Sequence, residues 1–253
     1  MRVVILAAGQ GTRLRPLTND LPKCMVGLNE KPLIQYQLDL FKQFGINDIN
    51  VVTGYLKEKI NFDHIKKFYN PYYTSTNMLY TLFCANELFD GSDDILISYG
   101  DIIYNSEVLS KIIDSKAKIN VVVDKDWKDY WQARMENPLE DAETLKIDSN
   151  GDIKELGKKA TSYDDIEGQY IGLIKLRKDF VLEFKKYYEN LDKTSTYDGK
   201  DYNNMYMTSF LQLITENIEP LKPVYIYNGW MEVDTPSDLL FSSFVKMNSA
   251  DNE

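Results

Sequence analysis

The sequence LAAGQGTRLRPLT, which runs from Leu6 to Thr18, decides how the rest of the chain is interpreted. The apolar run Val3-Val4-Ile5-Leu6 leads into it and is typical of a buried strand. Gly9 and Gly11 then predict a tight turn in which backbone amides can approach an anion, because no Cβ stands in the way. A cation, Arg13, follows at once. A strand, a glycine turn and a cation in this order indicate a site for the phosphates of a nucleoside triphosphate.

The spacing of the glycines excludes two common nucleotide motifs. A dinucleotide-binding turn needs G-x-G-x-x-G, and here Leu14 stands where the third glycine would be. The P-loop pattern G-x-x-x-x-G-K-[ST] is also absent. Taken alone, the two glycines indicate only a turn. A second cation, Lys23, follows Pro22 and strengthens the phosphate interpretation.

The whole stretch, with Pro22 and Lys23 after it, resembles the signature of the sugar-phosphate nucleotidyltransferase superfamily, L-A-A-G-x-G-T-R-L-x-P-L-T followed by P-K. The resemblance implies that Arg13 and Lys23 are catalytic, because they would stabilise charge on the reacting phosphates. It also implies nucleotide contacts from Leu6, Ala7, Ala8, Gly9, Gly11, Thr12, Asn77 and Gly100. For Asn77, a helix cap is the alternative role.

Composition limits the class of protein. The 253 residues are 43% hydrophobic, enough for one sizeable core, and we expect a single domain over 1–253 with a frayed acidic tail at 248–253. A net charge of −10 argues against nucleic acid and anionic membranes as partners. Two cysteines, with no signal peptide and no membrane-spanning run, predict a cytoplasmic protein. The oligomeric state stays open, with a homodimer as one alternative.

Strand-like and helix-like segments alternate along the chain, which predicts an α/β protein with a mainly parallel mixed sheet. The superfamily resemblance implies a three-layer α/β/α, Rossmann-like fold similar to that of GT-A glycosyltransferases. A charged helix carrying Ile60, Ile65 and Phe68 is expected, and Ser106 is expected to cap another. Asn150-Gly151 predicts a hairpin. This hairpin belongs to an acceptor-binding insert at roughly 124–176.

Two aspartates follow predicted strands and are candidates for a metal site. Asp101 follows the strand DILISY and Gly100, and Asp234 ends the run WMEVD. The carboxyl ends of parallel strands are where open α/β sheets bind ligands. Carboxylate oxygens suit Mg²⁺, so the pair predicts a magnesium cofactor, which the resemblance also implies. Turn or capping roles are the alternative for either residue.

The expected acceptor site is assembled from the insert and the last strand. By resemblance, Lys158 contacts the acceptor phosphate. Aromatic side chains would suit a quaternary ammonium, although they could equally pack a lid. Arg134 would suit an acceptor carboxylate. The proposed acceptor contacts are Trp127, Trp131, Arg134, Lys158, Tyr170 and Trp230.

Within the superfamily, the patterns PLIQYQ, GYLKE and WMEVD look most like the phosphocholine cytidylyltransferase branch. The resemblance implies that CTP and a small phosphorylated acceptor, either a phosphorylated amino acid or phosphocholine, react to give a CDP-linked product and pyrophosphate. No nucleophilic side chain is needed, because a phosphate dianion attacks directly. The only histidine, His64, is expected to be a surface bystander.

Three alternatives remain open. A sugar-1-phosphate nucleotidyltransferase would share the whole glycine stretch. A glycosyltransferase would use Asp124-x-Asp126 as a metal-binding D-x-D motif, but would leave that stretch without a role. A regulatory protein that binds a nucleotide without turnover would be expected to have lost one of the charged residues described above.

Overall fold

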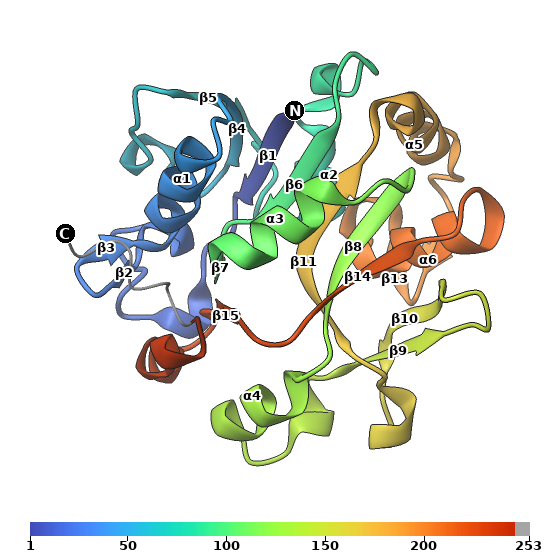
Figure 1. The fold of residues 1–253 in the computed structure, drawn as a ribbon. Coiled ribbons are helices and arrows are strands. Elements are labelled where there is room, and N and C mark those ends of the chain that lie inside the picture. Colours follow the sequence, from blue (N-terminus) through green and yellow to red (C-terminus); the bar gives the residue numbers. More distant parts are fainter. Residues whose placement is uncertain (246–253) are drawn as a thin grey trace.

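The computed structural model describes residues 1–245, and its main feature is a seven-stranded sheet in the order β14-β8-β11-β6-β1-β4-β5 (Figure 1). β11 is antiparallel to β6 and β8, and the other neighbouring strands are parallel. The prediction of a mainly parallel mixed sheet is therefore confirmed. The strands are β1 (Arg2–Ala7), β4 (Asp48–Thr53), β5 (Ile65–Tyr69), β6 (Ile95–Tyr99), β8 (Ile119–Asp124), β11 (Gln169–Leu176) and β14 (Lys222–Ile226).

Helices cover both faces of this sheet and make the fold three-layered (Figure 1). Successive side chains of a strand point to opposite faces, so β1 contributes Val3 and Ile5 to one apolar cluster and Val4 and Leu6 to the other. The first cluster includes buried residues of α1 (Leu33–Gln43) and α3 (Ser106–Asp114). The second includes those of α2 (Met78–Phe83), α5 (Lys178–Asn190) and α6 (Met207–Asn217).

The remaining elements are short and connect or extend these layers. The small strands form the antiparallel pairs β2 (Gly27–Leu28) with β3 (Lys31–Pro32), β7 (Ile102–Tyr104) with β15 (Trp230–Glu232), β9 (Glu143–Ile147) with β10 (Ile153–Lys159), and β12 (Thr196–Tyr197) with β13 (Lys200–Asp201). Helix α4 (Trp127–Arg134) follows β8. The 3₁₀ helices are η1 (Thr12–Leu14), η2 (Lys23–Met25), η3 (Lys57–Lys59), η4 (Asn86–Leu88), η5 (Pro138–Glu140), η6 (Tyr163–Asp165), η7 (Tyr202–Asn204) and η8 (Pro236–Val245).

Three local predictions can be compared with these elements. The hairpin at Asn150-Gly151 is confirmed as the connection between β9 and β10. The prediction of a charged helix carrying Ile60, Ile65 and Phe68 is wrong. The 3₁₀ helix η3 is followed by β5, whose pairing with β4 outweighs the local charge pattern. The cap of α3 is Asn105 rather than Ser106, since its side chain accepts a hydrogen bond from the Val108 amide at 3.1 Å. The predicted tail at 248–253 lies outside the described residues.

A cluster of aromatic side chains fills the core on the face of the sheet that α5 and α6 cover. The rings of Phe83 and Tyr188 stack with centroids 3.8 Å apart, and Phe184 meets Phe210 edge to face at 5.0 Å. Phe184 is fully buried, so its truncation removes both apolar burial and ring contacts.

We expect Phe184→Ala to lower the free energy of unfolding by about 4 kcal/mol, because the cavity it leaves cannot close fully. Urea denaturation followed by circular dichroism measures this loss. Leu182→Ala is the matched control on the same helix, and its 46% exposure predicts a loss below about 1 kcal/mol. Equal losses in the two variants would contradict this description of the core.

Candidate active site

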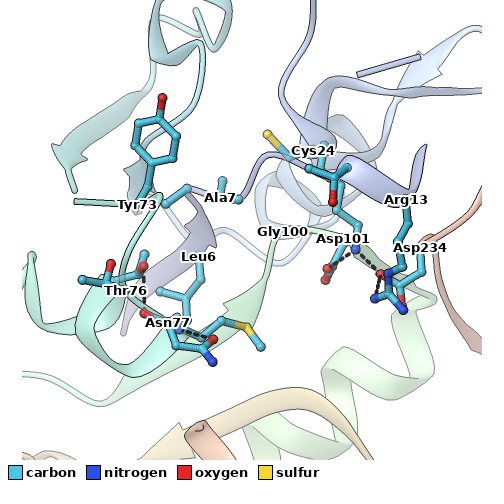
Figure 2. Close-up of a pocket in the computed structure, with 17 residues that line it drawn as sticks. Leu6, Ala7, Arg13, Cys24, Tyr73, Thr76, Asn77, Gly100, Asp101 and Asp234 are labelled. Atoms are coloured by element: carbon cyan, nitrogen blue, oxygen red, sulfur yellow. Dashed lines mark hydrogen bonds and ion pairs between the residues drawn. The ribbon is translucent and has the colours of Figure 1, made fainter. Parts of the chain in front are cut away.

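A cavity of ≈ 300 Å³ lies at the carboxyl ends of β1 and β6 (Figure 2). Figure 2 shows Arg13, Asp101 and Asp234 together at one end, and Tyr73, Thr76 and Asn77 at the other. The cavity is lined by Leu6, Ala7, Ala8, Gly9, Gly11, Thr12, Arg13, Lys23, Cys24, Tyr73, Thr76, Asn77, Met78, Thr81, Gly100, Asp101 and Asp234. The structure thus brings together every residue predicted to be catalytic, nucleotide-binding or metal-binding.

The glycine turn shapes the wall of this cavity. Gly11 has a φ of 62°, a left-handed conformation that glycine adopts without strain, and its carbonyl accepts hydrogen bonds from Leu14 N at 2.9 Å and Thr18 Oγ1 at 2.7 Å. Gly100 N donates to the Leu6 carbonyl at 2.9 Å. A Cβ on Gly100 would lie 2.7 Å from that carbonyl oxygen, so only glycine lets the ends of β1 and β6 approach this closely.

Three carboxylates cluster at one end of the cavity, and two of them, Asp101 and Asp234, line it. Asp101 lies between β6 and β7, and Asp234 lies two residues after β15. The pairing of β7 with β15 continues into a hydrogen bond from Val233 N to the Asp101 carbonyl at 3.0 Å. Asp101, Glu232 and Asp234 each offer an oxygen within 4.8 Å of the others. The sequence interpretation missed Glu232, although the alternation of side chains along WMEVD would have placed it on the same face as Asp234.

Two cations hold these carboxylates. Lys23 Nζ donates to Asp101 Oδ2 at 2.7 Å and also to Asp234 Oδ1. Arg13 Nη2 lies 2.9 Å from Asp234 Oδ1, and the Arg13 side chain is 63% exposed. The lysine is therefore a buried bridge between two carboxylates, whereas the arginine reaches the same carboxylate from the open side of the cavity.

The charge states follow from burial and from these contacts. Burial alone would lower the pKa of Lys23, but the carboxylates of Asp101 and Asp234 outweigh it and raise that pKa. Burial would raise the pKa of Asp234, but a hydrogen bond from Glu232 and the charges of Lys23 and Arg13 lower it. For Glu232, burial and the neighbouring Asp234 raise the pKa well above its ordinary value. The cluster therefore holds two acidic groups, Glu232 and Asp234, whose pKa values are shifted in opposite directions.

The donor set fits a divalent cation. Hard cations such as Mg²⁺ prefer oxygen ligands, and the three clustered side chains supply carboxylate oxygens. Within residues 1–245, Asp101 Oδ1 is buried and has no hydrogen-bond partner, so it is an available ligand. A cation at this position would take over the neutralising role that the Lys23 ammonium has in the structure.

The predicted acceptor aromatics lie elsewhere. Trp127 and Trp131 are 4% exposed and Trp230 is 1% exposed, and the last two rings pack with centroids 5.9 Å apart. Trp230 Nε1 also donates to Asp124 Oδ2 at 2.8 Å. These rings are interior packing between α4 and β15, and they present no face to the cavity in this structure. In the structure these three tryptophans therefore have the alternative role given above, which is packing.

Arg134 differs most from its predicted placement. Its side chain is 4% exposed, and Nε donates to Asp238 Oδ1 at 2.9 Å. An internal carboxylate therefore already occupies the position in which an acceptor carboxylate was expected. Lys158 is exposed on β10, with Nζ 3.4 Å from Glu155, and Tyr170 is partly exposed and packs edge to face on Tyr99 at 5.9 Å. Neither lines the cavity.

Two other candidate chemistries do not match the geometry. Asp124, the first residue of the D-x-D pattern, is buried and accepts hydrogen bonds from Trp230 Nε1 and from the backbone amides of Asp126 and Asn228. Burial, aided by Asp101, raises the pKa of the Cys24 thiol to about 12, so this cavity residue is a poor nucleophile. His64 is exposed, as expected for a bystander.

The fold and the cavity, with its glycine turn, paired cations and strand-end carboxylates, define a nucleotidyltransferase. The profile described as Nucleotidyl transferase matches residues 2–242, and the chain belongs to this family. Among the described residues, no helix has both the length and the hydrophobicity needed to cross a bilayer.

Individual relatives show which nucleotidyltransferases the chain is similar to. The chain is 47% identical, over 94% of its length and 98% of the relative's, to the CTP:phosphoglutamine cytidylyltransferase of Campylobacter jejuni. It is 47% identical to the choline-phosphate cytidylyltransferase of Streptococcus pneumoniae over a shorter region, 34% of this chain and 40% of that protein. The inositol-1-phosphate CTP transferase from T. maritima shares the fold, with a TM-score of 0.74 at 21% identity over 98% of this chain and 96% of that one.

Proposed function

We propose that this nucleotidyltransferase is a Mg²⁺-dependent cytidylyltransferase that joins CTP to L-glutamine phosphate, giving a CDP-linked product and pyrophosphate. The observation that carries the proposal is the identity to the Campylobacter jejuni enzyme, which extends over nearly the full length of both chains. The cavity supports the same reaction, because its wall carries the glycine turn, the cations Arg13 and Lys23 and the carboxylates of Asp101 and Asp234, with Glu232 beside them. Phosphocholine is the second candidate acceptor, supported by the shorter match to the choline-phosphate enzyme.

The reaction needs alignment and charge neutralisation rather than a nucleophilic side chain. A phosphate oxygen of the acceptor attacks the α-phosphorus of CTP and forms a new P–O bond. The bond from the α-phosphorus to the bridging oxygen breaks, and its electron pair leaves with pyrophosphate. The enzyme must hold two anions in line and stabilise the charge that develops on the phosphorus oxygens.

Each end of the cavity has a role in this proposal. The amides of the turn around Gly9 and Gly11 and the cations Arg13 and Lys23 would bind the triphosphate. Tyr73 and Asn77, at the opposite end in Figure 2, would lie beside the nucleoside. The Asn77 side chain also accepts a hydrogen bond from Met78 N at 2.7 Å, so it caps α2 and lines the cavity at once.

Asp101, Glu232 and Asp234 are the residues that would hold the metal. When bound, Mg²⁺ supplies Lewis acidity and neutralises phosphate charge. Lys158 and Tyr170 remain proposed acceptor contacts, since both are at least partly exposed. The packed tryptophans and Arg134 would shape that side of the protein from the interior.

The test is a comparison of acceptors with CTP and Mg²⁺, with release of pyrophosphate as the readout. We expect kcat/KM for L-glutamine phosphate to exceed that for phosphocholine and for sugar 1-phosphates by about 10-fold or more. The reason is that an amino-acid acceptor carries a carboxylate and a primary ammonium, which the other two acceptors lack. A preference for phosphocholine would select the second candidate. A preference for a sugar 1-phosphate would contradict both, and no turnover with any acceptor would favour a regulatory protein.

A further inference from the structure

The Arg134 side chain lies directly behind the carboxylate cluster. It ends α4, and its guanidinium meets the turn that follows β15. Nε and Nη2 donate to the two carboxylate oxygens of Asp238 at 2.9 and 3.4 Å. Both side chains are almost fully buried, with exposures of 4% and 3%. This buried, two-point ion pair is part of the protein interior and is closed to a ligand.

Asp238 ties this ion pair to the backbone that carries Asp234. Its Oδ2 accepts hydrogen bonds from the amides of Asp234 at 2.8 Å and Thr235 at 2.7 Å, and from Thr235 Oγ1 at 3.0 Å. The Asp238 carboxylate therefore fixes the turn at the residue where the Asp234 side chain departs. Arg134 in turn fixes the carboxylate, because a guanidinium fork allows one orientation of its partner.

The other guanidinium atoms extend the same support. Nη2 lies 3.7 Å from Asp234 Oδ2, and Nη1 lies 3.7 Å from Glu232 Oε2. On the same helix, the Tyr130 hydroxyl donates to the Glu232 carbonyl and accepts from the Glu232 amide, each at 3.0 Å. Helix α4 thus supports two of the three clustered carboxylates from behind.

We propose that Arg134 and Asp238 are positioning residues that set the orientation of Asp234 and Glu232 for metal binding. This inference rests on the metal site of the proposed function. It gives α4 a role that the sequence did not suggest: instead of presenting Arg134 to the acceptor, α4 orients the cluster from the side opposite the cavity. Partners that orient metal ligands from behind typically change metal affinity by about 10- to 100-fold.

The direction of the effect separates positioning from simple charge. A guanidinium near the carboxylates repels a divalent cation, so if only charge mattered, removing Arg134 would tighten metal binding. If Arg134 positions the ligands, removing it loosens metal binding. Removing one partner alone would leave a buried unpaired charge and confuse the result with misfolding.

The test therefore uses the double variant Arg134→Met/Asp238→Asn. It removes both charges, and the asparagine oxygen can still accept the hydrogen bonds from Asp234 N and Thr235 N. The dissociation constant for CTP is measured by calorimetry twice, once with Mn²⁺ and once with EDTA. The ratio of the two constants reports the metal site, and the constant in EDTA reports the rest of the nucleotide site.

We expect the double variant to raise the dissociation constant with Mn²⁺ by about 10-fold and the constant with EDTA by less than about 2-fold. The matched control is Lys175→Met, which removes a charge whose side chain is 5% exposed and lies 3.7 Å from Asp94. Lys175 is beside the amino ends of β6 and β8, away from the carboxylate cluster. It should lose stability and keep both constants. Arg134→Lys, which retains the charge but not the fork, should also weaken the metal-dependent affinity.

The two dissociation constants, compared between variant and wild type, decide the inference. A selective loss of the Mn²⁺-dependent affinity in a variant with native circular dichroism supports it. An unchanged or tightened affinity overturns it, as does an equal loss with Mn²⁺ and with EDTA. If Mn²⁺ does not tighten CTP binding to the wild type, the metal site of the proposed function is wrong and the inference falls with it. If the wild type binds no CTP under either condition, the proposed nucleotide is wrong.

Discussion

Asp234→Asn is expected to keep the fold and to lower kcat by about 10³-fold, a loss of about 4 kcal/mol in transition-state stabilisation. The Asp234 carboxylate contacts Lys23 and Arg13 and belongs to the three-carboxylate cluster, so the substitution alters the cations and the metal ligands together. Asp101→Asn should have an effect of similar size, because Asp101 Oδ1 is the available buried ligand atom. Steady-state release of pyrophosphate across a range of Mg²⁺ concentrations measures both.

Asp126→Asn is the control for this prediction. Asp126 is exposed and would be a ligand only in the D-x-D alternative. We expect its kcat to stay within about 2-fold of wild type, as for surface substitutions away from a site. Near-normal turnover of Asp234→Asn at saturating Mg²⁺ would disprove the carboxylate assignment. A large loss in Asp126→Asn would bring the glycosyltransferase alternative back.

Lys23→Ala is expected to lower kcat by about 10²-fold or more, with a smaller change in KM for CTP. Lys23 is protonated and buried beside the site proposed for the reacting phosphates, so it would stabilise charge that develops during the reaction. Arg13→Ala should lose less, because its exposed guanidinium acts in higher dielectric. Full kinetic curves in CTP and acceptor separate kcat from KM.

The matched control lies in the same segment as Arg13. Arg15 is exposed and does not line the cavity, so Arg15→Ala should be close to wild type. A rise in KM for CTP with kcat unchanged in Lys23→Ala would mean that Lys23 binds ground state and transition state equally. Its assignment as catalytic would then be wrong.

The glycine-turn end of the cavity was predictable because its conformation is encoded locally. The turn from Gly9 to Thr12 is set by its own residues, and the strand before it fixes where the turn lies on the sheet. Asp101 lies where the rule for parallel strands places it, after the carboxyl end of β6. Asp234 follows β15, which reaches the same place by pairing antiparallel with β7 outside the seven-stranded sheet. The mainly parallel sheet was predicted separately, from the alternation of strand-like and helix-like segments.

The positions of the residues predicted to bind the acceptor were less predictable, because those positions are decided by distant partners. Arg134 and Asp238 are 104 positions apart, so no spacing in the sequence could show that the arginine is already paired. A tryptophan buried in the core and a tryptophan that faces a ligand look the same in a sequence. Only the packing of α4 on β15 distinguishes them here. Likewise, β5 is a strand because β4 offers it a partner, whatever its charge pattern.

The contact between Lys23 and Asp234 affects how the protein folds during its synthesis. Lys23 and Asp234, which meet in the finished cluster, are separated by 211 positions, so closing this contact carries a large loop entropy. During synthesis the glycine turn and Lys23 emerge well before Asp234, which lies 211 positions after Lys23. A chain cut short before β15 would therefore lack both Glu232 and Asp234, and we expect such nascent fragments to be unable to consume CTP before the fold is complete.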